Sequence, residues 1–155
     1  MVFLVVWLAG ILAGAVTALA DPAMRTPAAI AANLLFYQVT ITVGLSGLIG
    51  FAGHTLASDR TAEGIGWATG SYFQKELGLA ELGWALVGIA ALVYRGTILN
   101  AAVLMVAPLF VGAAVIHIVE TRQRGNRNPG NYYAILPDLL IPATLVVLSA
   151  IAGIW

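Results

Sequence analysis

The residues that could do chemistry in this sequence are two histidines and a few carboxylates in an otherwise apolar chain. His54 and His117 each lie about three residues from the end of an apolar run. Two histidines from different helices could ligate a haem axially, and together with Glu76 and Glu120 they offer nitrogen and carboxylate ligands for iron, manganese or zinc. A haem or divalent metal held by His54, His117 and Glu120 is therefore one hypothesis. The simpler alternative is that each histidine hydrogen-bonds a neighbouring helix.

Glu81 belongs to the stretch Trp67 to Arg95, which we expect to organise the rest of the chain. Ser71 followed by Gln74 has the form of a capping box, so a helix should begin near residue 72. Glu81 then lies roughly nine residues inside an apolar helix. An ionisable side chain at that depth is costly in a membrane and indicates a functional site. The alternative is a protonated Glu81 bonded to a neighbouring helix.

Small residues predict where helices approach one another closely. The helix that contains Glu81 combines polar and small residues on one face, namely Gln74, Gly78, Glu81, Ala85 and Gly88. The preceding apolar segment carries glycines at 44, 47, 50 and 53, which form a bare edge for another helix. Gln38 in that segment is either an interhelical packing residue or, with Glu81, part of a transport path.

Composition identifies the environment of the chain. Of its 155 residues, 61% are hydrophobic and only 9% charged, and the mean hydropathy is +0.95. A soluble domain of this size needs more polar surface, so we expect an integral membrane protein whose first partner is the lipid bilayer. The net charge of zero excludes nucleic acid as an obvious partner. The absence of cysteine excludes disulfides and thiolate metal sites.

The apolar segments predict an all-α, polytopic transmembrane helix bundle that forms one domain over residues 1–155. We expect five spans, near 2–20, 28–57, 72–94, 97–119 and 138–155, although a four-span arrangement is possible. The first segment lacks the basic start of a signal peptide, and we therefore expect it to be retained. Two Gly-Asn pairs, at 125–126 and 130–131, are suited to turns with positive φ in the loop after the fourth span.

The distribution of basic residues predicts which end of the bundle faces the cytoplasm. Five basic residues lie on the side of the N-terminus, namely Arg60, Lys75, Arg122, Arg124 and Arg127, whereas only Arg25 and Arg95 lie on the other. The positive-inside rule then places the N-terminus in the cytoplasm, in the inner membrane of the cell. On this topology several polar groups share one membrane depth. We expect a cluster of His54, Gln74, Glu76, His117 and Asp138, covered by Trp67 and the loop from Asn126 to Asn131.

Several spaced motifs resemble a family of small, functionally uncharacterised prokaryotic multipass membrane proteins. They are Gly53-His54, Phe73-Gln-Lys-Glu-Leu-Gly78, the two Gly-Asn pairs and Asp138-Leu-Leu-Ile-Pro142. More distantly, Glu-Leu-Gly at the start of a span, Arg95 after it and a late histidine resemble DoxX-like membrane proteins, some of which are linked to quinol oxidation. Neither resemblance implies a catalytic residue.

Three functions remain open from the sequence. The first is a membrane-embedded binding or scaffold protein, or an accessory subunit, that acts as a homo-oligomer or within a larger complex. The second is a haem- or metal-binding, quinol-linked redox protein. The third is a small transporter or channel that uses Gln38, Gln74 and Glu81. The sequence has no motif for a catalytic triad or a phosphate-binding loop, so we do not expect a hydrolytic enzyme.

Overall fold

A computed structural model describes all residues, 1–155, and is helical without any β-strand. Five helices are long and apolar enough to cross a membrane. They are α1 (Val2–Ala20), a composite second span (Pro27–Leu56), α5 (Tyr72–Val93), α6 (Thr97–Gln123) and α7 (Pro129–Ala152). Large apolar side chains such as Leu86 and Leu104 point outward and are more than half exposed, as expected of helices that face lipid. The predicted all-α bundle is confirmed.

The second span alternates between two helix types. It consists of α2 (Pro27–Tyr37), a π-helical segment η1 (Gln38–Val43), α3 (Gly44–Phe51) and a second π-helical segment η2 (Ala52–Leu56). A π turn holds more than four residues and an α turn fewer than four, so residues spaced by four drift around the helix in opposite directions in the two types. Gln38, Thr42 and Ser46 are spaced by four residues, and His54 follows eight residues later. Because the two helix types alternate, these polar side chains stay near one face of the span, and the first three are fully buried.

The polar loops are shorter than the sequence indicated. Helix α6 continues to Gln123, beyond the expected end near 119, and α7 begins at Pro129 instead of 138. The earlier start of α7 has a local cause, because the Asn128 side chain caps it by accepting from the N–H of Gly130, with proline at the first helical position. The segment after the second span also holds a short helix, α4 (Ser58–Ile65).

The two Gly-Asn pairs do different things. Gly125 has φ of +66°, as expected for a turn, but Gly130 lies in the first turn of α7 and has no positive φ. A methyl group at Gly130 would collide with the carbonyl oxygen of Gly64 in α4. Gly130 is therefore required because the backbones of α7 and α4 approach closely there. The positive-φ turn predicted at this glycine is wrong.

Glycines hold the second span against its neighbours, as predicted. Gly44 packs on Gly88, and a Cβ at Gly47 would meet the backbone of α5 near Ala85. On the other side, Gly10 of α1 leaves room for two polar side chains of η1. Gln38 donates a hydrogen bond to the Trp7 carbonyl at 3.1 Å, and the Thr42 hydroxyl donates to the Val6 carbonyl at 3.3 Å. Gln38 thus joins two helices, which is the packing interpretation of this residue.

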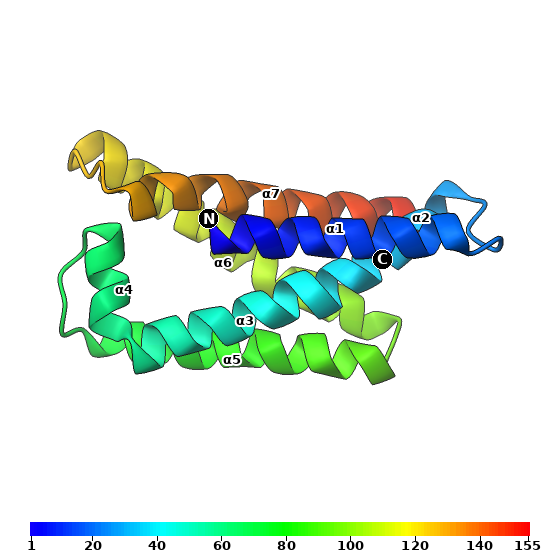
Figure 1. The fold of residues 1–155 in the computed structure, drawn as a ribbon, viewed down its shortest axis with the longest axis horizontal. Helices are drawn as coiled ribbons and strands as arrows, with labels where there is room; N and C mark the ends of the chain where they lie inside the picture. The colour runs from blue at the N-terminus through cyan, green and yellow to red at the C-terminus, as the bar shows by residue number, and fades with distance from the viewer.

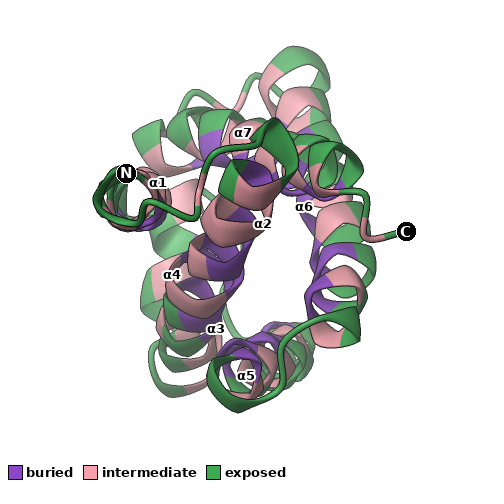
Figure 2. Ribbon diagram, turned by 90° about the vertical axis from the view of Figure 1, so that its right-hand side faces the viewer, coloured by how far each residue is buried: buried purple, intermediate pink, exposed green.

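The helices separate toward one end of the bundle. Figure 1 shows α3 and α5 running together and moving away from α6 and α7 as they approach α4. We call this end the α4 end. The buried apolar core lies toward the other end and in the middle, around Leu35, Trp84, Val103 and Ile141. Buried residues occupy the inner sides of the helices in Figure 2. A cavity lies between α5 and α6 at the α4 end, outside this core.

Candidate functional site

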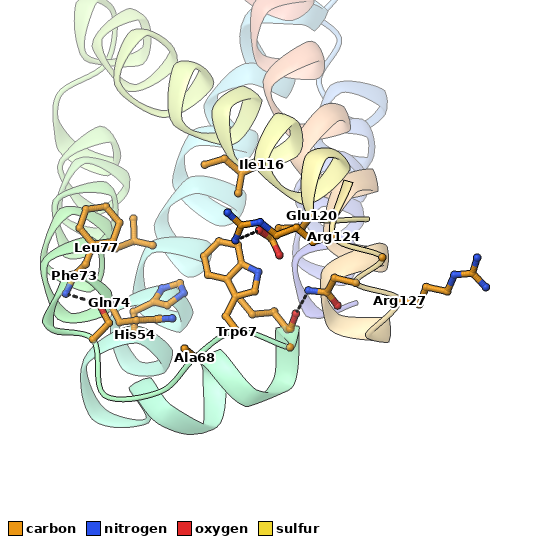
Figure 3. Close-up of a pocket in the computed structure, with 15 residues that line it drawn as sticks. His54, Trp67, Ala68, Phe73, Gln74, Leu77, Ile116, Glu120, Arg124 and Arg127 are labelled. Carbon is orange, nitrogen blue, oxygen red and sulfur yellow. Dashed lines mark hydrogen bonds and ion pairs between the residues drawn. The ribbon is translucent and has the colours of Figure 1, made fainter. Parts of the chain in front are cut away.

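A cavity of about 960 Å³ lies at the α4 end, between the start of α5 and the end of α6. Figure 3 shows its lining, to which η2, the end of α4, the first turns of α5 and the last turns of α6 all contribute. The polar part of this lining includes His54, Gln74 and Glu120. The apolar part includes Phe73, Leu77 and Ile116, together with the Trp67 indole. The cavity therefore combines a polar wall with an apolar one.

His54 is held at the cavity by a buried carboxylate. Its Nδ1 lies 2.6 Å from Oε2 of Glu81, whose side chain is only 6% exposed. Gly50, one turn before His54, makes this contact possible, because a Cβ there would lie within 2.6 Å of the same carboxylate oxygen. The carboxylate fixes the orientation of the imidazole and directs Nε2 away from the pair. An imidazole backed in this way is a hydrogen-bonding group of defined direction.

Two other polar groups around the cavity lack partners. Oε1 of Gln74 and Nε1 of Trp67 are buried, and neither makes a hydrogen bond within the protein. Gln74 as a whole is 7% exposed. Buried polar atoms are nearly always paired with protein or with a bound molecule, so an unpaired amide oxygen at a cavity wall marks a position where a ligand or water would bind.

His117 belongs to a second, separate network behind Trp67. Its Nδ1 lies 2.7 Å from Oδ1 of Asn131, while the Asn131 amide donates to the His117 carbonyl at 3.2 Å and to the Thr121 hydroxyl at 2.8 Å. These two acceptors fix the orientation of the amide, so His117 Nδ1 carries the proton. Nε2 then lies 3.8 Å from Oδ2 of Asp138. The Trp67 ring packs on the imidazole with centroids 5.7 Å apart.

Asparagine side chains fasten α4 to the start of α7. Asn126 donates to the Ile65 carbonyl at 2.9 Å, and Asn128 donates to the Glu63 carbonyl at 3.3 Å. The close approach of Gly130 to α4 completes this junction. Trp67 follows α4 directly, so the junction also determines where the indole lies. The role of Asn128 was not predicted from the sequence, although its position before a proline is a capping signal.

The structure brings part of the predicted cluster together. Trp67, His117, Asn131 and Asp138 are in contact as one group, and His54 and Gln74 line the same cavity. Glu76 is not part of it, because it is exposed and forms no ion pair or hydrogen bond. The correction follows from helix geometry, since two residues after Gln74 correspond to about 200° of rotation and place Glu76 on the opposite face.

The expected metal ligands do not converge. His54 pairs with Glu81, His117 with Asn131 and Asp138, and Glu120 forms an ion pair with Arg124 at 2.9 Å. No group of three or more histidine, aspartate or glutamate side chains is arranged to hold a metal ion. The pairing of His54 with Glu81 is the feature that the sequence did not predict, although it made each residue a candidate separately. The only available signal was Gly50, four residues before His54.

Five helices long and apolar enough to cross a membrane, with a polar-walled cavity at one end of the bundle, define a multipass helical membrane protein. Within this class, the chain belongs to the family of unknown function DUF6790, which matches residues 1–153. Membership in a functionally uncharacterised family was expected from the motifs and is confirmed at that level. No curated protein and no solved structure matches the chain. The likeness to DoxX-like proteins stays a resemblance.

Proposed function

We propose that this protein is a membrane-embedded binding protein that takes an amphipathic molecule from the bilayer into the cavity at the α4 end. The observation that carries the proposal is the division of the cavity lining. Phe73 of α5 and Ile116 of α6 line the cavity and are 70% and 49% exposed, so apolar side chains border its opening between these two helices. The opposite wall holds His54 and the buried amide of Gln74. An apolar chain would lie between the two helices, with its polar head at the inner wall.

The position of the cavity along the bundle supports the same function. It lies where α5 begins and α6 ends, next to the polar segments of α4 and the loop before α7. A head group bound there would be near the membrane surface, while its chain stayed in the apolar layer. We further propose that the α4 end faces the cytoplasm and that the membrane is the inner membrane, because most basic residues are at this end.

The other two functions have less support from the geometry. For the two histidines to hold a haem or metal together, His54 would have to leave Glu81 and His117 would have to leave Asn131. A transport path would use Gln38, which instead donates to the backbone of α1. Binding of an amphipathic molecule requires no rearrangement of these bonds.

Photolabelling with a defined set of probes tests the proposal. Four dodecyl probes would share one diazirine-bearing chain and differ only in the head, which is a hydroxyl, a methyl ether, a carboxylate or a trimethylammonium group. With the protein in lipid nanodiscs, at least one probe should label residues around Phe73, Leu77 and Ile116, and excess unlabelled probe should suppress this labelling.

Two variants separate the cavity from ordinary lipid contact. Leu77→Trp should obstruct the part of the cavity between α5 and α6 and strongly reduce the suppressible labelling, whereas Leu79→Trp, on the exposed surface of the same helix, should leave it unchanged. Circular dichroism and thermal unfolding would establish that both variants are folded. Uniform labelling of all lipid-facing helices that excess probe does not suppress would overturn the proposed function.

A further inference from the structure

The carboxylates around the cavity already have partners. His54 and Glu81 face each other at 2.6 Å, and Arg124 and Glu120 form an ion pair at 2.9 Å. Arg127 contributes to the lining, but Figure 3 shows its guanidinium pointing away from the cavity. A charged head group would have to break one of these pairs or remain uncompensated in a partly desolvated site, and both outcomes are unfavourable. The cavity therefore suits a neutral head.

Two uncommitted polar atoms at the inner wall are hydrogen-bond acceptors, while the Trp67 Nε1–H at the cavity is an unpaired donor that a hydroxyl oxygen can also satisfy. In the neutral tautomer of His54 whose Nδ1–H donates to the Glu81 carboxylate, Nε2 carries a lone pair, and it makes no bond within the protein. Oε1 of Gln74 is a buried acceptor without a donor. Two acceptors without donors select a ligand that donates hydrogen bonds, because a head with only acceptors would leave both of them unsatisfied.

We propose that the ligand is a neutral amphiphile whose head carries a hydroxyl group, and that this hydroxyl donates a hydrogen bond to Nε2 of His54 or to Oε1 of Gln74. The inference rests on the proposed function and narrows it to one class of head group. Glu81 is then a positioning residue, which holds the imidazole in the accepting tautomer and does not touch the ligand. The chain of the amphiphile lies along Leu77 and Ile116, which line the cavity on its two helices.

The four-probe series distinguishes this inference from the proposed function. Competition would be measured at equal mole fractions in the bilayer, so that differences in partitioning between heads are removed. We expect unlabelled dodecanol to suppress labelling at roughly a fivefold to tenfold lower mole fraction than dodecyl methyl ether, the effect of about one hydrogen bond. The carboxylate and trimethylammonium compounds should be no better than the methyl ether.

Two substitutions test the residues that recognise the hydroxyl. Gln74→Leu and His54→Phe each keep roughly the size of the side chain and remove one acceptor, so at least one of them should reduce the advantage of dodecanol over its methyl ether to about twofold or less while leaving the methyl ether unchanged. The matched control is Lys75→Leu, at the residue after Gln74, which is exposed and does not line the cavity. The competition series on the unmodified protein needs no variant and stays informative if Gln74→Leu does not fold.

The outcomes separate cleanly. Equal competition by all four heads, or preference for the carboxylate or the ammonium head, overturns the hydroxyl inference while the proposed function stands. An unchanged preference for dodecanol in folded Gln74→Leu and in folded His54→Phe overturns the assignment of these two acceptors. The absence of suppressible labelling with every head overturns both the inference and the proposed function.

Discussion

The substitution Gly50→Ala tests whether the contact between His54 and Glu81 depends on a bare helix surface. The added methyl group would overlap the carboxylate of Glu81, so either that side chain leaves His54 or α3 moves away from α5. Overpacking of this kind costs about 1–3 kcal/mol, and a lost hydrogen bond to a charged group costs about 1.5–3 kcal/mol. Since relaxation relieves part of the overlap, we expect the free energy of unfolding to fall by about 2–4 kcal/mol.

The measurement is an SDS titration in mixed micelles, followed by circular dichroism, with Gly112→Ala as the matched control. A Cβ at Gly112 in α6 meets nothing within 4 Å. That variant should be unchanged or more stable by up to about 1 kcal/mol, because alanine is a better helix former than glycine.

A double variant identifies the cause of the loss. In Gly50→Ala combined with Glu81→Ala the methyl group has no carboxylate to meet, so the two costs should be less than additive by about 1 kcal/mol or more. The reasoning would be refuted if Gly50→Ala matched Gly112→Ala, or if the double variant were additive within about 0.5 kcal/mol.

Three further predictions concern the topology, the second network and the α4 junction. In sealed spheroplasts, a membrane-impermeant maleimide should label a single cysteine introduced as Ala23→Cys but not one introduced as Arg122→Cys; the reverse pattern would invert the proposed orientation. Asn131→Ala removes three hydrogen bonds from a fully buried site and should lower the free energy of unfolding by about 2–3 kcal/mol, so an unchanged SDS midpoint would contradict the network. Gly130→Ala should make residues 58–70 more sensitive to limited proteolysis, whereas Gly64→Ala, where a Cβ meets nothing within 4 Å, should not; equal sensitivity would refute the close approach.

Periodicity was enough to predict which faces of the helices meet. The face of α5 that runs from Gln74 to Gly88 and the glycine edge of α3 were both assigned from spacing alone, and both are buried in the structure. Small residues on a membrane helix are informative because close packing, more than the hydrophobic effect, joins helices within a bilayer. The membrane environment, the helical class and the five spans followed from composition, because a backbone that crosses a bilayer must satisfy its own hydrogen bonds.

The partners of the polar residues could not be predicted in this way. Equal depth in the membrane suggested that His54 and His117 share a site, but depth says nothing of the direction in which each side chain leaves its helix. That direction depends on the rotation of each helix about its own axis. For His54 it depends on two π-helical segments, which no sequence period indicates. The pairing of His54 with Glu81 therefore required coordinates.

These π-helical segments set the rotation of the second span. A π-helix turns less per residue than an α-helix, so the six residues of η1 turn about as far as five α-helical residues would. If η1 wound as an ordinary α-helix at the same length, everything after it would rotate by about 100°. Gly47 and Gly50 would then turn away from α5, and His54 would no longer meet Glu81. A residue lost from α3 would likewise rotate all the contacts that follow, whereas a residue lost from η1 together with its π-helical turn would preserve them. Relatives with functional cavities should therefore tolerate a single-residue deletion within η1 but not within α3.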